Sequence, residues 1–228
     1  MCNAHLGCEL HDPDPDPKQL RREAKQGDIL IANYEDLSYK NRGVSSVYQR
    51  FWSEKGVQNR DIVVVRDWYN IAASRVAYIA AARAIGRHTL VAALPWASVA
   101  DTWADHARIL ADRQEGVVAV NYNRWFTDQK YTGDLADCFG VPRGGEHFSS
   151  VPAFGSGSSF DGLKNDGNAR SMNVLRRWEN LDEELLPEYM NVINESYAAV
   201  DGLNRQLFGF GRDEVLGFVE SGEAENVL

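Results

Sequence analysis

One short segment constrains the fold of this chain more than any other: an apolar strand that runs directly into a helix. Residues 61–66 form a near-continuous β-branched run, which is typical of a strand buried on both faces of a parallel sheet. A turn is expected at 67–70, followed by an alanine-rich helix at 71–86 that Gly86 ends. A strand followed at once by a helix is half of a βαβ unit, so this segment predicts an α/β domain.

Other apolar runs predict two further strands, at 28–33 and at 116–121. Helical patterns alternate with these strands, and this alternation favours a parallel sheet. The remaining helices are expected at 44–55, 98–112, 128–139, 171–178 and 182–206, and a Gly-, Ser-, Pro- and Asn-rich loop is expected at 142–170.

Composition excludes several classes of protein. The 228 residues suit one ordinary domain, and six Trp, nine Tyr and nine Phe supply core material that a disordered chain lacks. The net charge of −9 argues against a broad non-specific nucleic-acid surface, which needs a basic face. Three cysteines give no disulfide framework and no tight metal-binding spacing. No secretory leader and no membrane-length apolar stretch is found, so we expect a cytoplasmic protein without a membrane span.

The chain is expected to comprise three parts. Residues 1–27 are predicted to be irregular, because alternating Asp and Pro at 12–17 fit neither a helix nor a central strand. Residues 28–216 form the expected α/β domain, and 217–228 an acidic tail.

The end of the strand at 61–66 has the features of an anion site. Ligands of open α/β sheets bind beyond the carboxyl ends of the strands, where a helix N-terminus offers free N–H groups. Arg66 adds a forked, charged donor, and the hydroxyl of Ser74 lies near the second turn of the helix. The alternative is that Arg66 pairs with a carboxylate such as Asp67 or Asp36, and that Ser74 only faces the sheet. The sequence pattern alone favours neither the anion site nor this alternative.

The order strand, Arg66, seven residues, Ser74, helix resembles the 3′-phosphate motif of the sulfotransferases. In that family these two residues hold the 3′-phosphate of the donor, 3′-phosphoadenosine 5′-phosphosulfate. The chain has Trp68 where the family often has Pro. The likeness spans about residues 28–205, and the Arg66–Ser74 element is its specific part.

The resemblance implies a three-layer α/β/α fold of the P-loop NTPase-like sulfotransferase type, a sulfo-group donor as co-substrate and no metal. It implies a hydroxyl or amine acceptor on a small molecule or carbohydrate, and it does not indicate an oligomeric state. It also implies a nucleotide loop at Gly155, Ser156, Gly157, Ser158 and Ser159. The glycines let backbone N–H groups approach an anion closely, although any Gly/Ser cluster is also typical of a flexible surface loop.

The family's first strand and its Gly-rich basic phosphosulfate loop have no counterpart ahead of residue 28, so we expect an N-terminally incomplete sulfotransferase. The alternative is a non-catalytic nucleotide- or phosphate-binding module derived from the same fold. The candidate catalytic base is Glu35, just past the strand at 28–33, where the family often uses His. The alternative is that Glu35 is an ordinary solvated residue or a partner of Lys40.

Overall fold

The structure is a computed structural model, and it describes residues 4–5, 30–31, 38–39, 61–87, 90–143, 160, 164–168 and 171–221. Contacts divide the chain into two units, residues 1–61 and 62–228. In the first unit, β1 (Ala4–His5) pairs in parallel with β2 (Leu30–Ile31). The strand predicted at 28–33 is thus confirmed in its centre. β1 lies in the segment 1–27 that was expected to be irregular, because a two-residue strand leaves no periodic signal in the sequence.

The second unit holds the strands and helices that follow. β3 (Asp61–Val65) is hydrogen-bonded to β4 (Val117–Asn121). Together with the parallel pair β1–β2, these strands and the helices around them give the chain an α/β character. The helices are α3 (Trp68–Ala84), α4 (Leu90–Ala93), α5 (Trp96–Asp112), α6 (Tyr122–Thr127), α7 (Gln129–Phe139), α8 (Leu186–Phe208) and α9 (Arg212–Ser221), with 3-10 turns η5 (Arg177–Asn180) and η6 (Glu183–Leu185).

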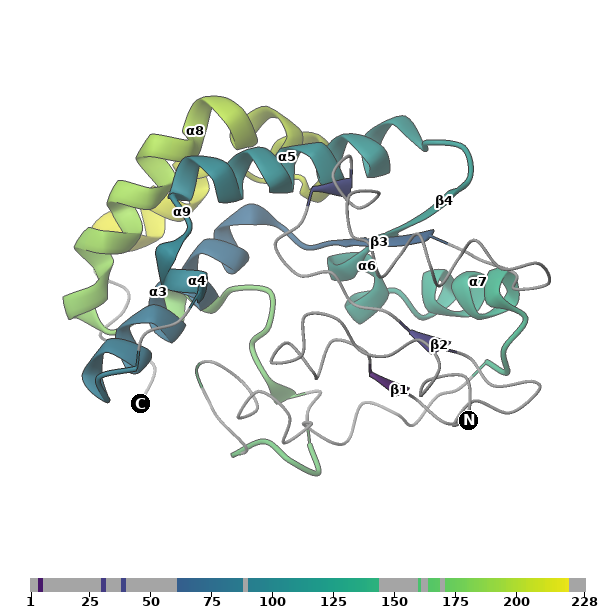
Figure 1. Cartoon of the computed structure of the whole chain (residues 1–228), viewed down its shortest axis with the longest axis horizontal. Coiled ribbons are helices and arrows are strands. Elements are labelled where there is room, and N and C mark those ends of the chain that lie inside the picture. Colours follow the sequence, from purple (N-terminus) through teal and green to yellow (C-terminus); the bar gives the residue numbers. More distant parts are fainter. Residues whose placement is uncertain are drawn as a thin grey trace. The chain divides into compact units, whose positions relative to one another are not determined.

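The helical core forms where α8 packs along α5 and against α3 (Figure 1). Trp68 and Tyr69, at the start of α3, are completely buried there. The Trp68 indole donates to the Ser196 hydroxyl at 2.9 Å, and the Tyr69 hydroxyl donates to the Asp201 carboxylate at 2.7 Å. These bonds hold the first turn of α3 against α8. The segment that follows β3 is therefore fixed in position.

The turn predicted at 67–70 is wrong, because α3 already begins at Trp68. Asp67 is its N-cap, and the Asp67 carboxylate accepts the backbone N–H of Asn70 at 2.9 Å. A capping Asp satisfies one of the free N–H groups of the first turn. The first helical residue, Trp68, therefore follows Arg66 by two positions.

The prediction that β3 is buried on both faces is also wrong. Val63 and Val65 are buried, whereas Ile62 and Val64 are 50% and 58% exposed. A β-branched run favours a strand whether one face or both are covered, so the sequence pattern does not separate the two cases.

Two other boundaries differ from the sequence predictions. The helix expected at 171–178 is replaced by turns that lead into η5, and α9 continues the chain through the predicted start of the acidic tail, to Ser221. The helices expected at 98–112 and 128–139 are confirmed as α5 and α7. Among the described residues, no helix has the length and apolarity needed to span a membrane.

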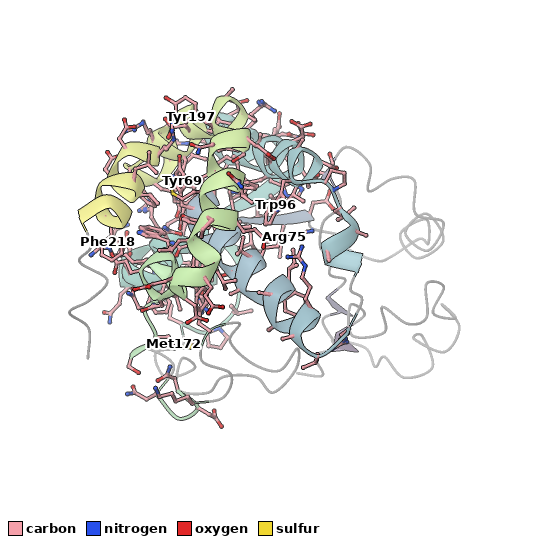
Figure 2. All side chains as sticks on the ribbon, turned by 90° about the vertical axis from the view of Figure 1, so that its left-hand side faces the viewer. Tyr69, Arg75, Trp96, Met172, Tyr197 and Phe218 are labelled. Atoms are coloured by element: carbon pink, nitrogen blue, oxygen red, sulfur yellow. The ribbon has the colours of Figure 1, made fainter. Side chains whose placement is uncertain are left out.

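An arginine further along α3 shows how the helices meet. Arg75 is only 9% exposed, and its guanidinium carbon lies 5.7 Å from the centre of the Trp96 ring at the start of α5 (Figure 2). The contact joins α3 to α5 by a cation–π interaction instead of placing Arg75 in solvent.

Candidate functional site

Arg66 lies between the end of β3 and the N-cap of α3, and its side chain is partly buried. Its Nη2 donates to the carbonyl of Val174, and its guanidinium carbon lies 5.3 Å from the centre of the Tyr122 ring. The backbone carbonyl of Arg66 accepts the Trp103 indole N–H at 2.7 Å. The Nε atom is buried and has no hydrogen-bond partner in the described part of the chain. Arg66 is therefore held firmly but retains an unused donor.

The charge of Arg66 is only partly compensated by its surroundings. Burial lowers the pKa of Arg66 to about 10, and the positive charge of Arg177 acts in the same direction. Asp67 and Tyr122 act in the opposite direction, and the lowering prevails. The guanidinium stays protonated at neutral pH, and an anion beside it would relieve both the desolvation and the repulsion.

Asp67 does not form the ion pair with Arg66 that the sequence left open. Its carboxylate, which is completely buried, accepts Asn70 N–H at 2.9 Å, Asn70 Nδ2 at 2.7 Å and Asn123 Nδ2 at 2.9 Å. No salt bridge joins Asp67 to Arg66 in the part of the chain that is described; the other candidate partner, Asp36, lies outside it. Burial raises the pKa of Asp67, against the lowering effects of the amide donors and of Arg66.

Asn70 joins the start of α3 to the segment 174–177. Its Nδ2 donates to the Leu175 carbonyl at 2.6 Å, and its Oδ1 accepts the backbone N–H of Arg177 at 2.6 Å. The neighbouring Val174 carbonyl is the acceptor for Arg66. The same short segment thus receives bonds from both Arg66 and α3.

Ser74 follows Asn70 by one helical turn and so lies on the same face of α3. Its Oγ atom is buried and has no hydrogen-bond partner among the described residues. Buried polar groups without partners are rare in proteins, and each calls for an explanation such as an absent ligand. Arg66 Nε and Ser74 Oγ are two such groups, and both belong to the motif that the sequence singled out.

Arg177 is a charged neighbour that the sequence analysis missed. It begins η5, is 7% exposed, and its guanidinium carbon lies 5.2 Å from the centre of the Phe160 ring. The segment was expected to be helical, so nothing in the pattern associated Arg177 with the end of β3. A buried arginine 111 positions away from Arg66 can be recognised only once the chain is folded.

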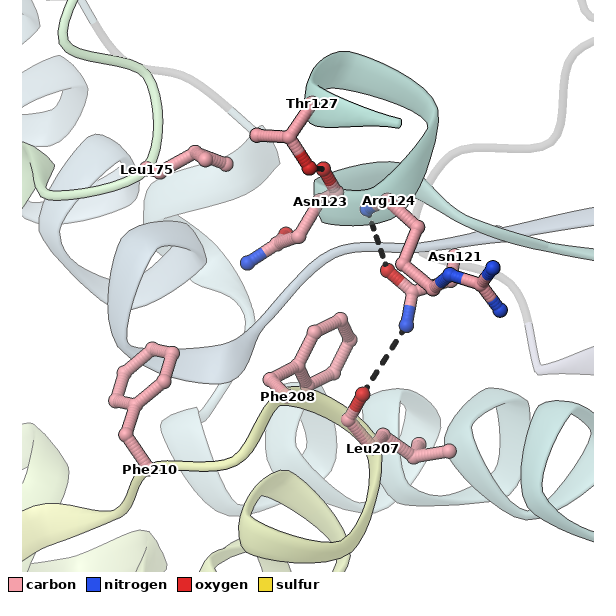
Figure 3. Close-up of a pocket in the computed structure, with 8 residues that line it drawn as sticks. All are labelled: Asn121, Asn123, Arg124, Thr127, Leu175, Leu207, Phe208 and Phe210. Carbon is pink, nitrogen blue, oxygen red and sulfur yellow. Dashed lines mark hydrogen bonds between the residues drawn. The ribbon is translucent and has the colours of Figure 1, made fainter. Parts of the chain in front are cut away.

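A pocket of about 310 Å³ lies at the carboxyl end of β4 (Figure 3). The side chain of Asn123 points into it, and the same amide donates to Asp67. Asn121, at the end of β4, links this strand to α8 by donating from its side-chain Nδ2 to the Leu207 carbonyl at 3.1 Å. Through Asn123, a residue that lines the pocket is hydrogen-bonded directly to Asp67. The residues that line the pocket are Asn121, Asn123, Arg124, Thr127, Leu175, Leu207, Phe208 and Phe210.

The remaining predicted site residues lie outside the described residues. They are Glu35, Gly155, Ser156, Gly157, Ser158 and Ser159. Within the described ranges, no three His, Cys, Asp or Glu side chains gather as metal ligands would.

Comparison of the chain with protein-family models, with curated proteins and with solved structures found no match. The candidate site therefore stands on its own geometry: Arg66 where β3 meets α3, and Ser74 in the second turn of α3, each with one buried polar atom that has no partner among the described residues.

Proposed function

We propose that this chain binds the 3′-phosphate of 3′-phosphoadenosine 5′-phosphosulfate at Arg66 and Ser74, as part of a sulfotransferase-like reaction. The observation that supports the proposal is the pair of buried, unpartnered polar atoms, Arg66 Nε and Ser74 Oγ, in the strand–helix motif that resembles the family's. A phosphate supplies acceptors to both at once. The proposal includes a three-layer α/β/α fold of the P-loop NTPase-like sulfotransferase type and a cytoplasmic location.

The proposed chemistry is mostly positioning and electrostatics. An acceptor hydroxyl or amine attacks sulfur, the bond from sulfur to the 5′-phosphate oxygen breaks, and adenosine 3′,5′-bisphosphate leaves. Glu35 is the proposed base that takes the acceptor's proton, and the loop Gly155–Ser159 is proposed to hold the nucleotide. Arg66 and Ser74 contact only the 3′-phosphate, so they fix the donor and do not take part in bond breaking.

Calorimetry with adenosine 3′,5′-bisphosphate tests the binding step, with adenosine 5′-phosphate as the comparison ligand. The wild type should prefer the bisphosphate, and Arg66→Ala should remove about ten- to hundredfold of that preference. Arg108→Ala is the matched control, because Arg108 is an exposed arginine on α5 that pairs with Asp105. Equal affinities of the wild type for the two nucleotides would overturn the proposal.

Transfer of labelled sulfate from the donor to a panel of phenols, amines and sugars then tests turnover. Bisphosphate binding without transfer to any acceptor would favour the second reading of the sequence, a non-catalytic nucleotide-binding module on the same fold.

A further inference from the structure

The pocket at the carboxyl end of β4 has a size that suits a small molecule. Its volume of about 310 Å³ lies at the lower end of the range for small-molecule sites, ~300–1,000 Å³. Asn123 enters it from α6, whereas Phe208 and Phe210 come from the end of α8 and the residues just after it (Figure 3). Leu175 and Leu207 complete the apolar part of the lining. A ligand here would bury its own apolar surface against these four side chains.

The aromatic part of this lining is held in place by contacts within the protein. The centre of the Phe210 ring lies 5.9 Å from that of Tyr69 and 5.4 Å from that of Trp178. The backbone carbonyl of Phe210 accepts the Nδ2 of Asn204 at 2.8 Å, and Phe208 is the last residue of α8. A pocket whose wall is already ordered binds a ligand without the cost of ordering it.

Most polar side chains of the lining already have partners. Asn121 uses both ends of its amide: its Oδ1 accepts the backbone N–H of Arg124 at 3.0 Å, and its Nδ2 donates to the end of α8. The Arg124 guanidinium pairs with Asp128 at 3.0 Å, and the Thr127 hydroxyl donates to the Asn123 carbonyl at 2.9 Å. These groups need no hydrogen bond from a ligand.

The side-chain amide of Asn123 is the exception. Its Nδ2 donates to the Asp67 carboxylate at 2.9 Å. A carboxylate only accepts hydrogen bonds, so the nitrogen of the amide must be the end that faces Asp67. The Oδ1 atom is buried and has no partner among the described residues, and only one of the two N–H groups on Nδ2 has one there. A buried amide with an unused acceptor calls for an explanation such as an absent ligand.

We propose that this pocket binds a small aromatic lactam, a planar ring with an N–H and a C=O side by side on one edge. The lactam N–H donates to Asn123 Oδ1, the lactam C=O accepts the second N–H of Asn123 Nδ2, and the ring lies against Phe208 and Phe210. A neutral ligand fits because Arg124, the charged residue of the lining, is already paired. The site is separate from the phosphate contacts of the proposed function and does not depend on them.

Calorimetry with quinolin-2(1H)-one tests this inference. The comparison probe is 1-methylquinolin-2-one, which has the same rings and carbonyl but a methyl group in place of the N–H. The wild type should bind the first probe about fivefold or more tightly than the second, because the methyl compound leaves Asn123 Oδ1 without a partner. Asn123→Leu should bind the two probes with nearly equal affinity.

Asn191→Leu is the matched control, because Asn191 is an exposed asparagine on α8 outside the pocket lining. It should keep the wild-type preference for the N–H probe. Equal affinities of the wild type for the two probes would overturn the proposal, and so would a preference that persists in Asn123→Leu.

A second variant covers the case in which Asn123→Leu does not fold, since that change removes an amide donor from Asp67. Thr127 is an exposed residue of the lining, so Thr127→Trp fills the pocket without burying a new polar group. It should weaken the binding of both probes by about tenfold or more, whereas Gln129→Trp, at an exposed position of α7 outside the lining, should leave it unchanged. Unchanged binding in Thr127→Trp would overturn the proposal.

Saturating adenosine 3′,5′-bisphosphate distinguishes this site from the nucleotide site of the proposed function. The affinity for quinolin-2(1H)-one should not change when the bisphosphate is present. Competition between the two would assign the pocket to the nucleotide and overturn the inference of a separate site. A chain that binds the quinolinone but not the bisphosphate would support this inference and count against the proposed function alone.

Discussion

Asn70 and Arg177 are joined by a hydrogen bond of 2.6 Å from the backbone N–H of Arg177 to the side-chain Oδ1 of Asn70. The bond connects residues 107 positions apart in the chain, and both are buried. The other end of the same amide donates to Asp67 at 2.7 Å and to the Leu175 carbonyl at 2.6 Å. A single side chain thus sets the position of the segment 174–177 relative to Arg66.

Replacing Asn70 by Ala should therefore destabilise the fold and weaken anion binding together. The variant leaves the Leu175 carbonyl and the Arg177 N–H buried without partners, which should cost about 3 kcal/mol of the free energy of unfolding. Urea denaturation measures this cost. Asn194→Ala, at an exposed position of α8, is the control and should change stability by less than about 0.5 kcal/mol. Equal effects of the two variants would contradict the role of Asn70.

Ser74→Ala should have opposite effects on stability and on binding. Its buried Oγ has no partner among the described residues, so removing the hydroxyl should leave the free energy of unfolding unchanged or raise it by up to about 1 kcal/mol. Affinity for adenosine 3′,5′-bisphosphate should fall by about fivefold or more, because one hydrogen bond to the phosphate is lost. Melting curves with and without the nucleotide separate the two effects. A variant that is less stable without ligand would show that Ser74 has a structural partner.

The order of strands and helices around Arg66 could be predicted because it depends on local patterns. The β-branched run that gives β3 and the alanine-rich run that gives α3 are both visible in the sequence, and Gly86 lies in the left-handed region at φ 67° just after the helix. The start of α3 was misplaced because Asp67, three residues before Asn70, was assigned to a turn. An Asp at this spacing is also an N-cap signal, and that signal gives the correct boundary.

The partners of Arg66 could not be predicted in the same way. Val174 contributes only a backbone carbonyl, which any residue offers, and Arg177 comes from a segment whose pattern suggested a helix. Nor does any periodicity in the sequence place the Tyr122 ring 5.3 Å from the Arg66 guanidinium carbon. The bonds from Arg66 and Asn70 to the segment 174–177 span more than 100 positions of the chain, and no local pattern in the sequence indicates them.

Two glycines near the C-terminus should respond differently to the same substitution. A Cβ at Gly211 would meet the side chains of Arg205 and Asp201, and Arg205 is held by Asp201, Asp213 and Glu214, each at 3.0 Å. Gly211→Ala should therefore cost about 1–3 kcal/mol, since Arg205 can yield only by giving up these bonds.

Gly217→Ala is the control for this change, because no atom lies within 4 Å of a Cβ at Gly217 within α9. It should raise the free energy of unfolding by about 0.5–1 kcal/mol through the higher helix propensity of Ala. Urea denaturation of the two variants measures the difference. A destabilised Gly217→Ala beside an unaffected Gly211→Ala would contradict this packing.

The last prediction concerns pH. Burial raises the pKa of Asp67 above 3.8 in the folded chain, whereas in the unfolded chain it returns to about 3.9. Between these two values the folded state binds more protons than the unfolded state, so this carboxyl makes stability fall as pH rises, until the folded pKa is passed. Asp67→Asn removes the titration and keeps an N-cap residue.

The free energy of unfolding of the wild type minus that of Asp67→Asn should therefore decrease as pH rises from about 3.5 towards neutrality. Each unit by which the folded pKa exceeds the unfolded one contributes about 1.4 kcal/mol to this decrease. The other carboxyl groups titrate in both proteins and cancel in the difference. A difference that increases with pH would mean that Arg66 and the amide donors of Asn70 and Asn123 outweigh the cost of burial. The charge of Asp67 would then stabilise the folded chain instead of straining it.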